Sequence, residues 1–349
     1  MNNKKLEIEV NTPPEGFKAS LRSRVIVALI LAVLFIPAFV LGGWVCLFMF
    51  MIALSIILVE VHLAPKKKYG WWIWVATFLI AFSYVYWFIL KSNLIGYKAD
   101  PDNYAFSLEN WYSSLDISII GIATSLIIYF TISMFDKNFT FDDVMYFFLM
   151  TILVGLGIQG FYFIRYFPFN AFINSTDVAS INGSVGAESV QGAAFQFWNS
   201  AELELYVLIG VVANDIFAYF GGIFFGKHKM IERISPKKTW EGFIWGIVFS
   251  VVCSCTFGLG CALGKSPMLP YLDLEHWYRI LILSLIIPLL GDLGDLSFSL
   301  IKRHFGIKDY GNILRGHGGV LDRIDSSIFA MIGVSIIVVF LSHGYNILL

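Results

Sequence analysis

Long apolar runs constrain this chain more than any other feature. A helix that crosses a bilayer needs roughly 20 mostly apolar residues, and the sequence contains about nine such runs. Only 14% of its residues are charged, against about 25% in soluble domains. The pattern therefore predicts an all-α, polytopic membrane bundle of about nine transmembrane helices. The candidate spans cover residues 25–41, 44–62, 71–90, 115–135, 143–164, 204–224, 242–264, 277–301 and 326–347.

The placement of basic residues predicts the orientation of these helices. If the N-terminus is cytoplasmic, 19 of the 24 Lys and Arg residues fall on cytoplasmic segments. Such a bias is what the positive-inside rule describes. We therefore expect a cytoplasmic N-terminus. The basic residues on the other side are Lys91, Lys98, Arg165, Lys265 and Arg279.

Ionisable residues divide the chain into three parts. Residues 1–24 are polar and predict a cytoplasmic tail. Residues 25–203 contain five spans with few ionisable groups and an outer loop, which favours a transmembrane scaffold. Residues 204–349 contain four spans and two basic cytoplasmic loops, which favours a catalytic transmembrane domain. No internal repeat is visible, and this weakens a transporter interpretation based on inverted repeats.

Three aspartates lie inside predicted spans. Each of Asp215, Asp292 and Asp295 costs roughly 2.5–3.5 kcal/mol at a helix centre on insertion scales, so a function is the default interpretation. Asp292 and Asp295 share one helix face because they are three residues apart. All three lie roughly 15–20 Å from the basic cytoplasmic end of their helix. We expect them to meet in one cavity that opens to the cytoplasm.

Carboxylates beside phosphate-binding cations suit a Mg²⁺ ion that is shared with substrate phosphates. This predicts Asp215, Asp292 and Asp295 as metal ligands. Two alternatives remain open at this stage: a structural hydrogen-bonded network, and a path for protons or a monovalent cation.

The cytoplasmic loop before the seventh span contains the sequence SPKKTWEG. Ser235-Pro236 predicts a turn, and Thr239 predicts the N-cap of the helix that follows. Lys237 and Lys238 would then stand beside a helix N-terminus, where backbone N–H groups and the helix dipole favour anions. The alternative is that the lysines only reflect the positive-inside bias.

The loop after the eighth span is richer in charge. It supplies Lys302, Arg303 and Lys308, followed by the sequence GHGG over residues 316–319, whose glycines allow a phosphate to approach the backbone. His317 is a candidate proton donor or hydrogen-bond donor, with a structural histidine as the alternative.

Asp322 and Asp325 follow at the mouth of the ninth span, again three residues apart. A site role is one interpretation. Capping of the helix N-terminus is the alternative for both, because acidic residues are favoured there.

The stretch from Ser299 to Asp325 closely resembles the diagnostic segment of the phosphatidate cytidylyltransferase family, the CDP-diacylglycerol synthases. The segments SPKKTWEG and GDLGDLSFS are also similar to that family. One departure is visible, because Arg315 stands where the family usually has proline. The matching residues are Ser299, Lys302, Arg303, Lys308, Asp309, His317, Gly318, Gly319, Asp322, Arg323 and Asp325.

The resemblance implies an enzyme of the cytoplasmic (inner) membrane with its active site facing the cytoplasm. Such an enzyme condenses CTP with phosphatidate from the inner leaflet to give CDP-diacylglycerol and pyrophosphate. It requires Mg²⁺, with a second metal or a monovalent cation as a further expectation, and the family suggests a homodimer. No nucleic acid is involved.

The resemblance also implies roles for individual residues. We expect catalytic roles for Lys237, Lys238, Lys302, Arg303, Asp309, His317 and Asp322. We expect substrate binding by Ser235, Thr239, Lys308, Gly318, Gly319 and Arg323.

Other function classes fit the sequence less well. An ion-coupled membrane transporter could use intramembrane aspartates, but it has little reason to collect phosphate-binding cations beside GHGG. The DG-AR-G-D-D array of CDP-alcohol phosphotransferases is not found, and neither is the GxxxxGK[ST] motif of standard nucleoside triphosphatases.

Overall fold

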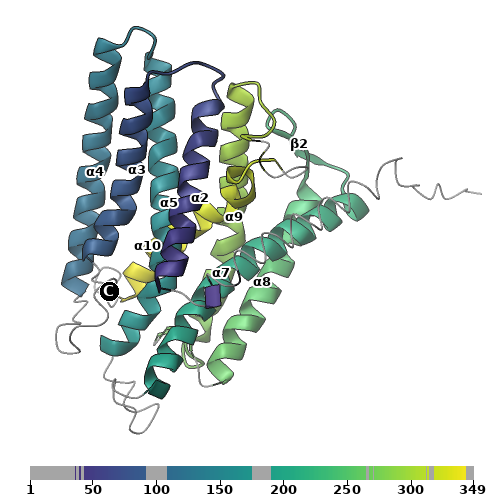
Figure 1. The fold of residues 1–349 in the computed structure, drawn as a ribbon. Coiled ribbons are helices and arrows are strands. Elements are labelled where there is room, and N and C mark those ends of the chain that lie inside the picture. Colours follow the sequence, from purple (N-terminus) through teal and green to yellow (C-terminus); the bar gives the residue numbers. More distant parts are fainter. Residues whose placement is uncertain are drawn as a thin grey trace, which may run out of the picture.

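The computed structural model describes residues 36, 39–40, 43–91, 108–174, 190–264, 267–269, 271–311, 313 and 318–342. The chain folds into a bundle of long helices with one short β-hairpin (Figure 1). The elements are α2 (Gly43–Leu63), α3 (Trp71–Lys91), α4 (Leu108–Phe135), α5 (Phe141–Asn174), α7 (Val190–Phe225), β1 (Lys229–Ile231), β2 (Ser235–Thr239), α8 (Trp240–Leu263), α9 (Trp277–His304) and α10 (Leu321–Ser342).

The helices α2 to α10 overlap the second to ninth predicted spans, although α5 and α7 extend well beyond theirs, and this confirms a multi-pass helical bundle. The first predicted span, residues 25–41, lies largely outside the described residues. Trp71–Tyr86 and Gly121–Phe135 are shorter apolar helices. Within the described residues, 6 helices are long and apolar enough to cross a membrane: Val45–Leu63, Phe141–Arg165, Ala201–Phe225, Trp240–Leu263, Trp277–His304 and Leu321–Leu341. The count of nine and the cytoplasmic N-terminus stay predictions.

The loop between α7 and α8 differs from the all-α prediction. Instead of a turn at Ser235-Pro236, β2 pairs antiparallel with β1, and Ser235 lies opposite Ile231. The turn falls earlier, where the Ile234 N–H donates to the Ile231 carbonyl at 3.2 Å. Proline is tolerated in β2 because an edge strand can leave one N–H position without a partner.

Small residues let α8 pack closely against α7. The buried residues of α8 recur every four positions: Gly242, Gly246, Ser250, Ser254, Gly258 and Ala262. Such a stripe allows two helix backbones to approach each other within a membrane. A Cβ atom at Gly246 would lie only 2.6 Å from Asn214 Oδ1 on α7. In Figure 1, α7 and α8 run together at an angle to α2, α3, α4 and α5.

The apolar core lies where α2, α5, α9 and α10 pack together. Leu54, Phe147, Ile287 and Met331 come from these four helices, and each is fully buried. In lipid, association of such helices depends on close packing and on interhelical hydrogen bonds. The core therefore fixes α9 and α10 relative to the N-terminal helices.

Several loops that were predicted to be cytoplasmic meet at one end of this bundle, at the top of Figure 1. Lys67, between α2 and α3, forms an ion pair with Asp143 at the start of α5. Arg303, at the end of α9, donates to the Ile234 carbonyl in the hairpin turn at 3.2 Å. This shared end is where the predicted site residues gather.

Candidate functional site

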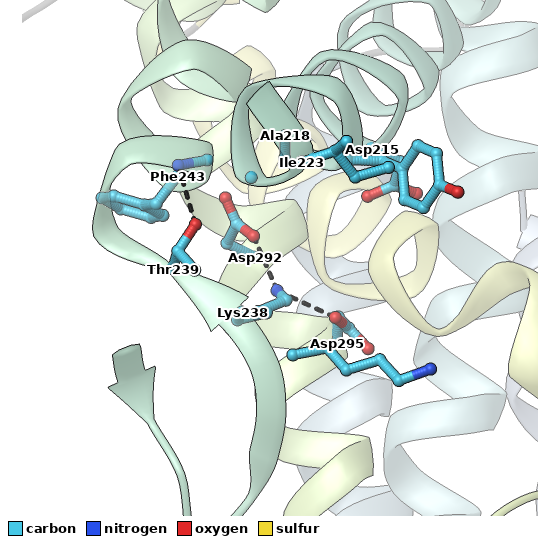
Figure 2. Close-up of a pocket in the computed structure, with 12 residues that line it drawn as sticks. Asp215, Ala218, Ile223, Lys238, Thr239, Phe243, Asp292 and Asp295 are labelled. Atoms are coloured by element: carbon cyan, nitrogen blue, oxygen red, sulfur yellow. Dashed lines mark hydrogen bonds and ion pairs between the residues drawn. The ribbon is translucent and has the colours of Figure 1, made fainter. Parts of the chain in front are cut away.

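The three intramembrane aspartates line one cavity of about 340 Å³. It lies where α7, β2, the start of α8 and α9 meet (Figure 2). Asp215 comes from α7, and Asp292 and Asp295 come from α9. The prediction that these carboxylates meet in one cavity is confirmed. Its other lining residues include Ala218, Tyr219, Ile223, Lys237, Lys238, Thr239 and Phe243.

Lys238 lies between two of these carboxylates. Its Nζ atom is 2.8 Å from Asp292 Oδ1 and 2.8 Å from Asp295 Oδ2 (Figure 2). The sequence predicted that Lys238 faces an anion site at a helix N-terminus, but its ammonium group contacts carboxylates instead. Burial lowers the pKa of Lys238, but Asp295 and Asp292 more than offset this and raise the pKa above its ordinary value. Lys238 is therefore charged at neutral pH.

Asp292 has a second partner that the sequence reasoning missed. The Asn214 Nδ2 atom donates to Asp292 Oδ2 at 3.0 Å, and the Asn214 side chain is buried. Asn214 and Lys238 thus hold the two oxygens of one carboxylate. The sequence did contain a signal for this contact, since Asn214 directly precedes Asp215 in an otherwise apolar span. Polar side chains inside a membrane usually form hydrogen bonds with a neighbouring helix.

Thr239 is the N-cap of α8, as predicted. Its Oγ1 atom accepts a hydrogen bond from the Gly242 N–H at 3.1 Å. The neighbouring Lys237 is exposed, lines the cavity, and has no ion pair among the described residues. Ser235 lies at the start of β2, and the cavity lining does not include it in the described part of the chain.

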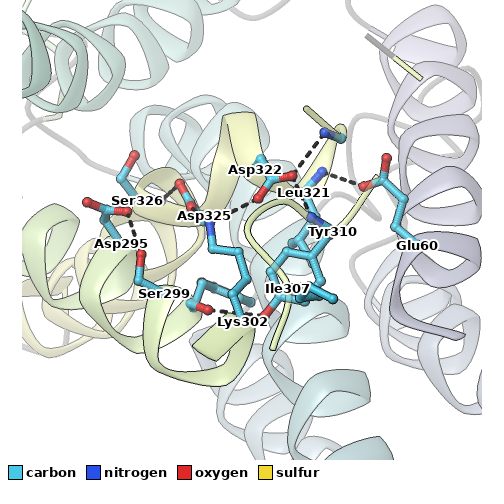
Figure 3. Close-up of polar contacts among 12 residues, drawn as sticks. Glu60, Asp295, Ser299, Lys302, Ile307, Tyr310, Leu321, Asp322, Asp325 and Ser326 are labelled. Atoms are coloured by element: carbon cyan, nitrogen blue, oxygen red, sulfur yellow. Dashed lines mark hydrogen bonds and ion pairs between the residues drawn. The ribbon is translucent and has the colours of Figure 1, made fainter. Parts of the chain in front are cut away.

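A second cluster surrounds Lys302, further along α9 (Figure 3). The Lys302 Nζ atom is 2.9 Å from Asp322 Oδ1 and 3.5 Å from Asp325 Oδ2, and all three residues are buried. Ser299, one turn before Lys302 on α9, donates to Asp295 in the cavity at 3.4 Å. Polar residues on α9 therefore extend from the cavity to the last turn of the helix.

Asp322 caps the N-terminus of α10, which was the open alternative for this residue. Its Oδ2 atom accepts from the Gly319 N–H at 2.9 Å and from the Tyr310 N–H at 2.8 Å. Gly318 has a φ of 83°, a backbone conformation that favours glycine. A Cβ atom there would also lie 3.0 Å from Asp322 Oδ2.

The remaining predicted residues lie around these clusters. Arg303 donates to the carbonyls of Ile234 and Ile307, so it ties the hairpin to the end of α9. Lys308, Asp309 and Arg323 are exposed. His317 and Arg315 lie outside the described residues.

The carboxylates that line the cavity are possible ligands for a metal ion. In the described ranges, no group of three or more His, Cys, Asp or Glu side chains is arranged to hold one. Mg²⁺ usually takes only one or two carboxylates and completes its shell with water and substrate phosphates. Asp292 and Asp295 supply two carboxylates on one cavity wall. The donor set therefore fits Mg²⁺, provided that Lys238 moves from between them.

The chain is similar to known cytidylyltransferases over most of its length. Residues 22–341 match the model of the cytidylyltransferase family. A phosphatidate cytidylyltransferase of Bacillus subtilis (strain 168) is 33% identical over 232 residues, which cover 66% of this chain and 70% of that protein. One from Staphylococcus haemolyticus (strain JCSC1435) is 32% identical over 227 residues, covering 64% and 70%. One from Staphylococcus aureus (strain COL) is 41% identical over 146 residues, covering 40% and 52%.

Proposed function

The chain belongs to the cytidylyltransferase family and is a nucleotidyltransferase, and we propose that it transfers the cytidylyl group of CTP to phosphatidate. The products are CDP-diacylglycerol and pyrophosphate. The names of the relatives support this substrate pair. The observation that carries the proposal is the cavity in which Asp215, Asp292 and Asp295 meet Lys238 inside the helical bundle.

The reaction makes modest demands on acid–base chemistry. A phosphate oxygen of phosphatidate attacks the α-phosphorus of CTP, and the bond from that phosphorus to the β-phosphate oxygen breaks. The nucleophile is already ionised, so no strong general base is needed. The main barrier is bringing two anions together, so positioned cations supply most of the catalysis. Lys237 and Lys238 line the cavity in which this would occur.

We propose Mg²⁺ as the cofactor, held by Asp292 and Asp295 with Asp215 close to them in the cavity. Bound Mg²⁺ would neutralise charge on the phosphate oxygens of the substrate. Asn214 orients the Asp292 carboxylate, because it donates to the oxygen that Lys238 does not contact. Lys238, once it has moved from between the carboxylates, would donate to a phosphate oxygen of the substrate.

The active site would face the cytoplasm from within the inner membrane. CTP would enter from the basic end of the bundle, where Lys237 is exposed. Phosphatidate would enter from the bilayer along the apolar wall formed by Ala218, Ile223 and Phe243. We also propose a homodimer, for which the exposed apolar residues on α7 and α8, such as Val212 and Val252, provide surface.

The proposal is tested with the purified full-length chain in vesicles that contain phosphatidate. Labelled CTP and Mg²⁺ are added, and label is measured in the chloroform-soluble fraction. We expect incorporation that requires phosphatidate and stops when EDTA removes the metal. Vesicles with diacylglycerol in place of phosphatidate are the matched control. Incorporation without phosphatidate, or none with both substrates present, would contradict the proposal.

A further inference from the structure

A buried carboxylate in the N-terminal half of the chain contacts the loop between α9 and α10. We call this loop the motif loop. Glu60 lies near the end of α2 and is 1% exposed. Its Oε1 accepts from the Val320 N–H at 2.8 Å, and its Oε2 accepts from the Leu321 N–H at 2.9 Å (Figure 3). In the described part of the chain, no lysine or arginine forms an ion pair with it. The backbone of α10 is therefore its main partner.

The N-terminus of α10 explains why Glu60 is needed there. The first N–H groups of a helix have no partner within the helix, and a side chain at the N-cap usually accepts from them. Asp322 reaches back to the Gly319 N–H, as the acidic residue of a capping box does. Gly319 has no side chain that could accept from the N–H groups at the start of α10. Glu60, on another helix, accepts from the Val320 and Leu321 N–H groups.

Two glycines leave the space that Glu60 occupies. A Cβ atom at Gly319 would lie 2.5 Å from Glu60 Oε1 and 2.6 Å from Glu60 Oε2. A Cβ atom at Gly311 would lie 2.5 Å from Glu60 Oε1. Any other residue at either position would push the carboxylate away. The glycines of the motif loop thus allow it to pack closely against Glu60 of α2.

The same end of α10 holds the cluster beside the cavity. Asp322, in the first turn of α10, binds Lys302 on α9 and the Tyr310 N–H in the loop. A second contact from the N-terminal half supports this region, because Tyr146 donates to the Val61 carbonyl at 2.8 Å and stacks edge-on against Phe305. A shift of the α10 N-terminus would therefore move Asp322 and Lys302 together.

We propose that Glu60 is a positioning residue, which caps α10 from α2 and thereby fixes Asp322 and Lys302, the pair that holds α9 and its cavity carboxylates in place. This inference rests on the proposed function. It also assigns the N-terminal half of the chain a part in the active site, where the sequence predicted only a scaffold.

The first test compares Glu60→Gln with Asp143→Asn in the full-length protein. Asp143 is a matched control, because it is buried at the same end of the bundle but binds Lys67, Tyr69 and Thr140 rather than the motif loop. We expect Glu60→Gln to lower kcat by at least about tenfold, and Asp143→Asn to stay within about twofold of the parent. Turnover of Glu60→Gln within about twofold of the parent, at an unfolding midpoint like that of Asp143→Asn, would overturn the proposal.

A rescue experiment separates capping from general damage. Gly319→Ser provides a side-chain cap within α10, and Glu60→Ala vacates the space it needs. We expect Gly319→Ser to lower turnover in the parent but to restore it by at least about threefold in the Glu60→Ala protein. If Glu60→Ala alone does not accumulate, recovery of folded protein in the double variant supports capping. A double variant that is no better than Glu60→Ala contradicts it.

Hydrogen exchange at the Val320 and Leu321 amides gives a readout that does not depend on turnover. We expect faster exchange in Glu60→Gln than in Asp143→Asn, because only the first change removes an acceptor from these amides. Unchanged exchange would overturn the capping role even if the enzyme is active. Faster exchange in a protein that makes no CDP-diacylglycerol would instead contradict the proposed function alone.

Discussion

Two clusters on α9 share one composition and differ in their surroundings. In each, a lysine lies between two aspartates, but Lys238 comes from the hairpin and its partners line the cavity. Lys302 comes from α9 itself, and its partners Asp322 and Asp325 lie on α10. The Lys238 side chain is 23% exposed and that of Lys302 is 9% exposed. We call them the open cluster and the closed cluster.

The two clusters differ in burial, and we infer that burial determines the role of each lysine–aspartate cluster. In the open cluster, water or a cation can replace Lys238 as a partner of the carboxylates, and Lys238 can then contact a substrate phosphate. In the closed cluster, breaking the pair leaves a buried charge, which costs about 3–5 kcal/mol. We therefore infer that the open cluster contacts substrate and metal, while the closed cluster holds α9 against α10 beside it. Ser299 lies between the two clusters on α9 and donates to Asp295 of the open cluster.

The largest expected effect breaks the closed cluster. Lys302→Glu would place a third carboxylate beside Asp322 and Asp325, so repulsion adds to the loss of the cation. We expect a loss of unfolding free energy above about 5 kcal/mol, and therefore little folded protein in the membrane. Thermal unfolding of detergent-solubilised protein measures this. A folded, active Lys302→Glu protein would show that Lys302 is not buried between Asp322 and Asp325.

The next effect concerns the carboxylates of the open cluster. Asp292→Asn and Asp295→Asn keep the side-chain volume and remove the charge. We expect kcat to fall by at least about 100-fold in each, because both a metal ligand and an electrostatic partner of Lys238 are lost. The assay is label from CTP in the lipid fraction, with Asp143→Asn as the control. Turnover near that of the parent at limiting Mg²⁺ would rule out both as metal ligands.

A smaller effect is expected at Lys237. This residue is exposed, lines the cavity and has no ion pair among the described residues. Lys237→Gln should raise the KM for CTP about threefold while stability is unchanged, because an exposed charge contributes less than about 1 kcal/mol. Initial rates over a range of CTP concentrations check this. An unchanged KM would leave Lys238 as the lysine of that segment that acts on substrate.

The smallest effect is a pH dependence. The pKa of Lys238 is raised above its ordinary value of 10.5, so the stability it contributes is complete below that value and is lost only as pH rises above it. The small difference in unfolding midpoint between the parent and Lys238→Gln should therefore be equal at pH 7 and pH 9. A difference that disappears by pH 9 would show that Lys238 does not sit between two carboxylates.

Much of the fold could be predicted because hydrophobic runs of membrane length have few alternative structures. The positions of α2 to α10 and the meeting of Asp215 with Asp292 and Asp295 follow from span boundaries and helical rise. The hairpin was missed because β1 and β2 are too short to show a period. The direction of Lys238 was missed because its partner Asp292 is 54 residues away, and sequence does not show which charges meet.

The role of Glu60 was also beyond the sequence. A single acidic residue near the end of a predicted span looks like part of the polar membrane boundary. Only the packing of α2 against the motif loop shows that Glu60 is buried and accepts from Val320 and Leu321. Glu60 and Val320 are 260 residues apart. Contacts between such distant residues depend on the tertiary fold, which local sequence patterns do not determine.

If the reaction takes place in the cavity of the open cluster, Lys238→Gln and Lys302→Gln should differ in kind. Both variants are prepared side by side, and kcat for CDP-diacylglycerol formation and the free energy of unfolding are measured for each. For Lys238→Gln, we predict a loss of at least about tenfold in kcat with a smaller loss of stability than in Lys302→Gln. For Lys302→Gln, we predict a stability loss of about 3–5 kcal/mol. A folded Lys238→Gln protein with the kcat of the parent would contradict the account.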